Sequence, residues 1–332
     1  MTHPRLWIRP EGRLATLLLG LSLSLPAQAI EYAPLTITAS NYPLAYFAER
    51  LGGAQVRVEL PVPNDEDPAY WQPDAPTIQA MQKADLIALN GADYEKWLNR
   101  VSLPRSKWVD TSAAFKSRYL VIKDAVTHSH GGTGMHSHDG TASTTWLDFT
   151  QAAQQVDALA AAMIRTRPAL RSTIEHNRVA LDADLMRLDA EMKQVAGALA
   201  GQALMASHPV YQYLERRYGL NLKSVHWEPG EMPPASEWTA LRQTLSAHPA
   251  RLMLWEEMPS TEIQATLAEL KLRPLDFRPC ANRPVSGDWL SIMRANIAHL
   301  QEASTSSPEP IRKKSVRAKS TSPKTPARKH GP

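Results

Sequence analysis

The apolar residues between Pro168 and Gly201 recur with the period of an α-helix. They fall at steps of three, four and seven residues, at Leu170, Ile174, Leu181, Leu185, Leu188, Met192, Val195 and Leu199. This spacing lines one face of a helix, and Pro168 and Gly201 suit its first turn and its left-handed end. A helix over residues 168–200 would extend about 48 Å at 1.5 Å per residue. The pattern alone fits a core helix, a coiled-coil arm or a rigid connector.

The hydrophobic pattern before this helix alternates between two periods. Short apolar runs predict strands, and spacing near 3.6 residues predicts helices. The predicted strands are Leu35–Ala39, Val56–Val62, Leu86–Leu89, Lys107–Val109 and Tyr119–Ile122, and the predicted helices are Leu44–Leu51, Ala75–Lys83 and one that starts at Tyr94–Leu98. Alternating elements with short connections predict an α/β lobe with a mainly parallel sheet. We assign this lobe to residues 30–148.

Residues 202–303 repeat the alternation. The predicted strands are Ala203–Ala206, Leu222–Trp227, Leu252–Trp255 and Pro274–Phe277, and the predicted helices are Val210–Tyr218, Ala235–Ser246, Ser260–Leu270 and Ser286–Leu300. Ser236 and Ser260 are candidate helix caps. Because α/β blocks flank the long helix on both sides, we predict an α/β fold of two lobes with mainly parallel sheets, joined by one long rigid helix. The connecting helices occupy residues 149–201.

The two ends of the chain differ from the blocks between them. Residues 1–29 combine a basic start, an apolar run over Leu14–Leu25 and a small-residue Ala27-Gln28-Ala29 site, which predicts a cleaved signal peptide. The run of about 12 apolar residues is too short for a bilayer span of about 20. We therefore expect an exported protein whose mature chain begins near Ile30.

Charge is segregated toward the carboxy-terminal end. Residues 304–332 hold eight basic residues and one acidic residue, Glu309, among many Ser and Pro residues, so a disordered basic tail is predicted. The rest of the mature chain has 26 basic and 31 acidic residues, and the pI of about 9.1 comes from the ends. The tail suits an acidic partner or plain solvation, and the exported address argues against nucleic acid. With Cys280 as the single cysteine, the chain has no internal disulfide.

A histidine-rich loop over residues 128–139 carries candidate metal chemistry. Four of the eleven histidines lie there among Gly and Ser residues, at His128, His130, His136 and His138. Neutral imidazoles are good ligands for Zn²⁺, Cu²⁺ and Ni²⁺. We favour metal contact over a merely soluble loop, and the loop does not identify the metal.

Further polar residues follow the predicted strands of the second block. They are His208, His226 with Glu228, Glu256 with Glu257, and Asp276. Ligands of open parallel sheets bind beyond the carboxyl ends of the strands, so these residues are candidates for one site. The sequence has no G-x-S-x-G, no H-E-x-x-H and no phosphate-binding glycine loop. We therefore predict a binding protein and not an enzyme.

From Leu35 to Glu302 the chain resembles the metal-binding solute-binding proteins of zinc and manganese ABC importers, the zinc-uptake and adhesin-like group. The motifs that carry the resemblance are Asn41-Tyr42-Pro43-Leu44, Ala48-Glu49-Arg50-Leu51-Gly52-Gly53, Val62-Pro63 with Asp67-Pro68, Lys83-Ala84-Asp85-Leu86, Asn90-Gly91, Trp97-Leu98, Trp146-Leu147-Asp148, and Ser207-His208-Pro209 with Tyr211, Tyr213, Tyr218 and Gly219. The resemblance implies two α/β lobes joined by a long helix, with metal held between them and delivered to a permease.

The resemblance also shows where this chain departs from its relatives. The family's first two ligand histidines correspond to Ala69 and Thr144, while the third matches His208 and the fourth ligand matches Asp276. Alanine has no donor atom, and threonine is a poor zinc ligand. We therefore predict a non-standard ligand set of His208 and Asp276, helped by His226, Glu228 or the loop histidines His128, His130, His136 and His138.

The resulting hypothesis is capture of a transition-metal ion, Zn²⁺ first and otherwise Mn²⁺, Cu²⁺ or Ni²⁺, by a periplasmic monomer that serves an ABC permease in the inner membrane. Binding should weaken as the pH falls through the imidazole range near 6.5. Two alternatives remain. The cleft binds a metal chelate between Tyr70, Trp71 and Trp227, or the protein is a metallochaperone or interaction protein on a degenerate binding-protein fold.

Overall fold

A computed structural model of the chain describes Met1 and residues 33–122, 127–129, 135–137 and 140–305. The predicted signal peptide and nearly all of the predicted basic tail lie outside the described residues. The chain divides into two units, Met1–Ala33 and Pro34–Pro332, and the account that follows concerns the second. Both predicted sheets belong to this second unit.

The first sheet has four parallel strands in the order β2-β1-β3-β4. They are β1 (Leu35–Ala39), β2 (Val56–Glu59), β3 (Leu86–Leu89) and β4 (Trp108–Asp110). The central strand β3 is buried at every position, as expected where helices cover both faces of a parallel sheet. The predicted strand at Tyr119–Ile122 is shorter, β5 (Val121–Ile122), and pairs antiparallel with β8 (Gly140–Thr141) outside this sheet.

We call the predicted lobes of residues 30–148 and 202–303 the first half and the second half. Two helices of the first half begin at capping residues. In α1 (Tyr42–Gly52) the Asn41 side chain accepts a hydrogen bond from Leu44 N at 3.1 Å, and Asp74 caps α2 (Ala75–Lys83) in the same way. The helix predicted from Tyr94 is instead a 3₁₀ turn, Lys96–Arg100. Other 3₁₀ turns are Gly53–Gln55, Arg105–Lys107, Ala113–Arg118 and Thr145–Leu147.

The second sheet repeats the first, with four parallel strands in the order β10-β9-β11-β12. Its strands and helices are β9 (Ala203–Ala206), α5 (Gln212–Tyr218), β10 (Asn221–Ser224), α6 (Ala235–Ala247), β11 (Leu252–Trp255), α7 (Thr261–Glu269), β12 (Arg273–Asp276) and α8 (Trp289–Thr305). Ser260 caps α7 as predicted, accepting from Ile263 N. The predicted Ser236 cap is wrong, because α6 starts after Pro234 and Ser236 already lies inside its first turn.

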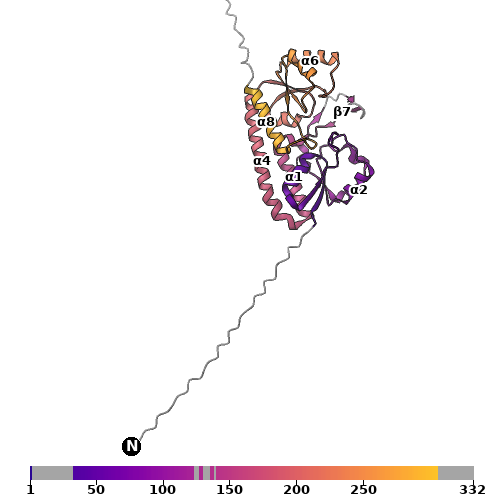
Figure 1. The fold of residues 1–332 in the computed structure, drawn as a ribbon, viewed down its shortest axis with the longest axis vertical. Coiled ribbons are helices and arrows are strands. Elements are labelled where there is room, and N and C mark those ends of the chain that lie inside the picture. The colour runs from indigo at the N-terminus through magenta and orange to yellow at the C-terminus, as the bar shows by residue number, and fades with distance from the viewer. Residues whose placement is uncertain (2–32, 123–126, 130–134, 138–139, 306–332) are drawn as a thin grey trace, which may run out of the picture. The chain divides into compact units, whose positions relative to one another are not determined.

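The long helix joins the two halves. After α3 (Phe149–Thr166), Pro168–Leu170 form a 3₁₀ turn that leads into α4 (Arg171–Ala198). All eight apolar residues of the predicted stripe are at most 6% exposed, and α4 packs against α1, α3 and α8 (Figure 1). Gly201 has a φ of +75°, the left-handed conformation that glycine accepts readily. The predicted α/β fold with a long connecting helix is confirmed.

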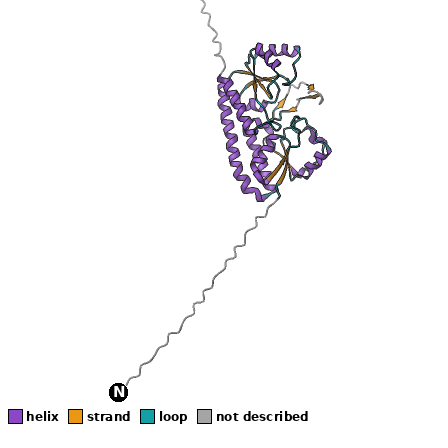
Figure 2. Cartoon of the chain, in the orientation of Figure 1, coloured by secondary structure: helices purple, strands orange, loops and turns teal. Residues whose placement is uncertain are grey.

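Charged pairs tie α4 to both halves. Asp189 of α4 accepts from Arg217 of α5 at 2.9 and 2.8 Å. Asp184 lies 2.9 Å from Arg50 of α1 and 3.3 Å from Arg294 of α8. The two sheets lie on the same side of α4 in Figure 2, so these contacts and the buried stripe hold both sheets against one helix.

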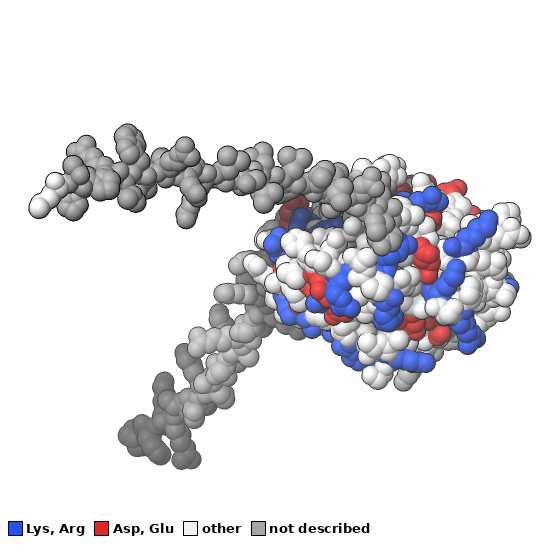
Figure 3. Space-filling view, turned by 90° about the horizontal axis from the view of Figure 1, so that it is seen from below, with Lys and Arg blue, Asp and Glu red and all other residues white. Residues whose placement is uncertain are grey.

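On the described surface drawn in Figure 3, Lys and Arg side chains are interspersed with Asp and Glu. Among the described residues, the helices lack a segment that is both long and apolar enough to cross a membrane.

Candidate metal centre

Polar residues follow the strands of the second sheet at the edge formed by the carboxyl ends of those strands, which we call the carboxyl edge. Backbone hydrogen bonds continue the ladder past the strand ends, from Ser207 N to Leu254 O at 2.8 Å and from Trp227 N to Ser207 O at 2.7 Å. The ladder keeps His208, His226 and Glu256 at one edge, since each follows its strand by one or two residues. This is the edge at which open parallel sheets bind ligands.

His208 stands at the middle of this cluster. Its residue is 6% exposed, and its Nδ1 atom lies 3.6 Å from Oε1 of Glu228. The rings of His208 and His226 meet edge to face, with centroids 5.6 Å apart. Four ligands were predicted in the second half, and the structure brings three of them together: His208, His226 and Glu228.

Carboxyl groups from both halves act on Glu228, which contacts His208. Burial raises the pKa of Glu256 to about 8, and the negative charges of Asp67 and Glu228 add to the rise. Burial also raises the pKa of Glu228 to about 7, with Glu231 and Asp67 contributing. The pKa of Tyr70 is raised by burial and by Asp67, Glu256 and Glu228. These charge effects link Asp67, Glu228 and Glu256 with Tyr70, and we refer to the three carboxyl groups as the acidic cluster.

Asp67 is the member of this acidic cluster that comes from the first half, and it is not among the ligands predicted from the sequence. It lies in the loop between β2 and α2, and although the residue is exposed, desolvation at its carboxyl group raises its pKa. Its Oδ1 accepts from Ala69 N at 2.9 Å, and its carbonyl accepts from Tyr70 N and Trp71 N. The Asp67-Pro68 pair directly precedes Ala69, the position of the missing histidine, and is the only local sequence signal for Asp67.

The two positions that lack the family histidines have other partners. Ala69 N bonds Asp67, as above, and the Ala69 side chain packs at the margin of the main hydrophobic core. The Thr144 hydroxyl donates to the carbonyl of Val210, two residues after His208. Thr144 therefore joins the first half to the turn that bears His208.

Asp276, predicted as a ligand, lies at the end of the edge strand β12, where it pairs with Trp255 of β11. Its Oδ2 atom is 3.2 Å from Nε of Arg278, and its backbone carbonyl contacts His299 Nδ1 at 3.1 Å. The charges that act on Glu256 are those of Asp67 and Glu228. Asp276 is thus on the same sheet edge as His208 but paired with arginine.

The histidine-rich loop is described only in part. Strands β6 (Thr127–Ser129) and β7 (Met135–Ser137) pair antiparallel, and the register sets His128 opposite His136. His130 and His138 lie outside the described residues.

The site contains imidazole and carboxyl groups, the donors that transition metals prefer, but these groups do not yet point at one common position. Within the described part of the chain, no group of three or more His, Cys, Asp or Glu side chains already has metal-ligand spacing. Imidazole nitrogens and carboxylate oxygens nevertheless suit zinc and its first-row neighbours, and a divalent cation would offset the repulsion between Asp67, Glu228 and Glu256. Side-chain rotation is needed for these groups to share one ion.

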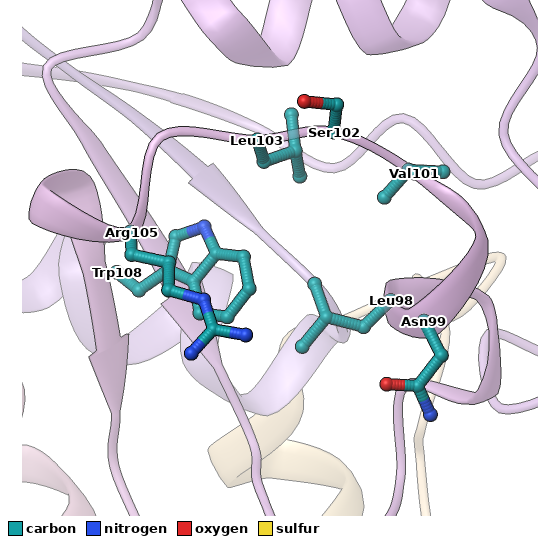
Figure 4. A pocket seen from close by; sticks show the side chains of 7 residues that line it. All are labelled: Leu98, Asn99, Val101, Ser102, Leu103, Arg105 and Trp108. Carbon is teal, nitrogen blue, oxygen red and sulfur yellow. The ribbon is translucent and has the colours of Figure 1, made fainter.

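A cavity of about 340 Å³ lies elsewhere, in the first half (Figure 4). Its lining residues are Leu98, Asn99, Val101, Ser102, Leu103, Arg105 and Trp108. The Arg105 guanidinium sits 5.5 Å from the centre of the Trp108 ring. Because this lining has an arginine and no carboxylate, imidazole or thiol, it does not suit a metal cation.

Two parallel sheets tied by a long helix, with His and carboxylate groups collected at a sheet edge, define the class of metal-importer solute-binding proteins. A family model described as the zinc-uptake complex component A, periplasmic, matches residues 37–303. The chain belongs to this family, and the resemblance predicted from its motifs is confirmed.

The curated relatives have low sequence identity to this chain but match it over most of its length. The zinc-binding lipoprotein AdcA of Streptococcus pneumoniae is 22% identical over 280 residues, covering 81% of this chain and 55% of AdcA. The chain therefore spans about half the length of AdcA. The high-affinity zinc uptake system protein ZnuA of Bacillus subtilis is 24% identical over 246 residues, covering 70% of this chain and 74% of that protein.

Solved structures agree on the fold. The Zn(II)-bound ZnuA-like domain of Streptococcus pneumoniae AdcA has a TM-score of 0.69 at 20% identity, covering 82% of this chain and 99% of that chain. The FpvC binding protein of Pseudomonas aeruginosa, in complex with Ni²⁺, has a TM-score of 0.67 at 19% identity, covering 84% and 99%. At these identities the likeness concerns architecture.

Proposed function

We propose that the protein works outside the cytoplasm and captures a divalent transition-metal ion, zinc in the first place, between its two halves. The captured ion is then delivered to an ABC permease. The observation that carries the proposal is the contact of His208 with His226 and Glu228 at the carboxyl edge of the second sheet. Family membership supports import as the purpose of that capture.

The proposed ligand set replaces the missing histidines with oxygen donors. His208 and His226 supply nitrogen, Glu228 and Glu256 supply oxygen, and Asp67 closes the shell from the first half. Such a set has the three or more protein ligands that zinc requires. It also suits Mn²⁺ and Ni²⁺, which two FpvC structures contain, so the ligand set alone does not select zinc.

We do not include the remaining predicted ligands, Asp276 and the loop histidines, in this ligand set. The ion pair between Asp276 Oδ2 and Arg278 competes with metal for the Asp276 carboxylate. We propose that the loop histidines His128, His130, His136 and His138 collect metal ahead of the cleft, since ordering a glycine-rich loop on each binding event limits its affinity.

The pH dependence of capture follows from the carboxyl groups. Glu228 and Glu256 have raised pKa values of about 7 and 8, and each must lose its proton before it binds metal. Affinity is therefore expected to rise with pH through 7 and toward 8. This range lies above the imidazole range near 6.5 that the histidines alone predict.

The proposal is tested by zinc calorimetry on four proteins. They are the intact mature chain, His208→Ala, a deletion of residues 128–138, and His176→Ala, whose exposed histidine on α4 is the matched control. We expect His208→Ala to lose at least about 100-fold in affinity, and the control to bind unchanged. Tight binding that survives His208→Ala and disappears with the loop would instead favour a metallochaperone.

A further inference from the structure

The loop that follows β12 crosses from the second half to the first. Pro279 O accepts from Trp146 Nε1 at 2.8 Å, and Ala281 O accepts from Tyr42 N at 2.8 Å. Trp146 is fully buried and Tyr42 is 5% exposed. Two hydrogen bonds to buried partners thus fix the loop backbone against the first half.

The next residue, Asn282, reaches the loop that carries Asp67. Its Nδ2 donates to Pro63 O at 2.6 Å and to Glu66 O at 2.9 Å. Its Oδ1 accepts from Arg283 N at 2.7 Å. Because that backbone donor occupies the oxygen, the amide nitrogen is the atom that faces the two carbonyls.

The two carbonyls belong to the turn directly before Asp67. Glu66 N bonds Pro63 O within this turn at 3.2 Å, and beyond it Asp67 Oδ1 accepts from Ala69 N. Asn282 therefore holds the turn on one side of Asp67, while the Ala69 amide fixes the carboxylate on the other. The backbone that carries Asp67 is therefore held in place, while the Oδ2 atom of its carboxylate is not engaged by these bonds.

We propose that Asn282 is a positioning residue that presents Asp67 to the metal cleft, so that the second half sets the place of the first half's ligand. The inference rests on the proposed function, since it takes Asp67 as a metal ligand. It explains how a cleft without the usual first-half histidines keeps an oxygen donor in place. Outer contacts of this kind typically change metal affinity 10- to 100-fold when removed.

The test is a double-mutant cycle on the full mature chain, with Zn²⁺ as the probe and affinity read by competition with a chromophoric chelator. The variants are Asn282→Ala, Asp67→Ala and the double variant. The matched control is Asn221→Ala, an exposed asparagine at the amino end of β10, away from the carboxyl edge. Asn282→Asp keeps the side-chain shape while replacing the donor with an acceptor, so it separates positioning from packing.

We expect Asn282→Ala and Asn282→Asp each to weaken zinc binding about tenfold, with unchanged melting of the apo protein. The double variant should match Asp67→Ala within twofold, because Asn282 acts only through Asp67. Unchanged affinity in Asn282→Ala, or losses that multiply in the double variant, would overturn the inference. So would an Asp67→Ala variant that binds normally while His208→Ala does not. Normal binding in both Asp67→Ala and His208→Ala would instead overturn the proposed function.

Discussion

Zinc binding at pH 7 should release protons from Glu228 and Glu256, the partly buried glutamates of the proposed site. A carboxyl group with a pKa of about 8, as for Glu256, is roughly 90% protonated at pH 7, and one with a pKa of about 7, as for Glu228, is roughly half protonated. A metal ion binds only the carboxylate form. Full coordination by both groups should therefore release about 1.4 protons from this pair.

Calorimetry in buffers with different ionisation enthalpies measures this number directly. The observed enthalpy varies linearly with the buffer's ionisation enthalpy, and the slope is the number of protons released per zinc ion. Glu256→Gln should lower the slope by about 0.9, because the amide has no proton to lose. Glu257→Gln, at the exposed neighbouring position, should leave the slope unchanged.

Two results would refute this reasoning. A slope near zero for the intact protein would mean that zinc binds without ionising Glu228 and Glu256. A slope that Glu256→Gln and Glu257→Gln reduce equally would mean that the protons come from general charge effects and not from a coordinating glutamate.

Two further predictions concern stability. The pKa values of Glu228 and Glu256 in the folded protein lie above the unfolded value of about 4.5, so the unfolded chain loses these protons first as the pH rises. The unfolding free energy of the metal-free protein should therefore fall between about pH 5 and pH 8. Urea unfolding should show a smaller fall in Glu256→Gln; an equal fall would contradict the assigned pKa. Leu185→Ala, at a fully buried position of the α4 stripe, should cost about 2–5 kcal/mol of unfolding free energy. Val179→Ala, 66% exposed on the same helix, should change it by less than about 0.5 kcal/mol; similar losses in both would contradict the buried stripe.

Much of the architecture was predictable because its signals are local. The α4 stripe repeats over eight positions, and the strand Leu35–Ala39 and the helix Ala75–Lys83 match their predicted bounds. Errors arose where several local signals compete. Ser236 is a good cap residue, but the extended backbone of Pro234 starts α6 earlier. Tyr119–Ile122 has strand composition, yet only its last two residues are in a strand, β5.

The site was less predictable because its members come from distant parts of the chain. Strand ends pointed to His208, His226 and Glu228, since parallel strands share one carboxyl edge. Asp67 and Asn282 carry no periodic signal. The roles proposed for them depend on loops from opposite halves, which meet in the folded chain through hydrogen bonds between residues more than 200 positions apart. Asp276 fits a ligand pattern by sequence, but its nearby charge partner is Arg278.

The central claim is that the cleft, and not the histidine loop, provides the tight metal site. X-ray absorption at the zinc edge, on the zinc-loaded protein with one equivalent of metal, tests it directly. We predict a shell of about two imidazole nitrogens and two or more carboxylate oxygens at roughly 2.0–2.2 Å, unchanged when residues 128–138 are deleted. A shell of three or four imidazoles that is lost with the loop would contradict the claim.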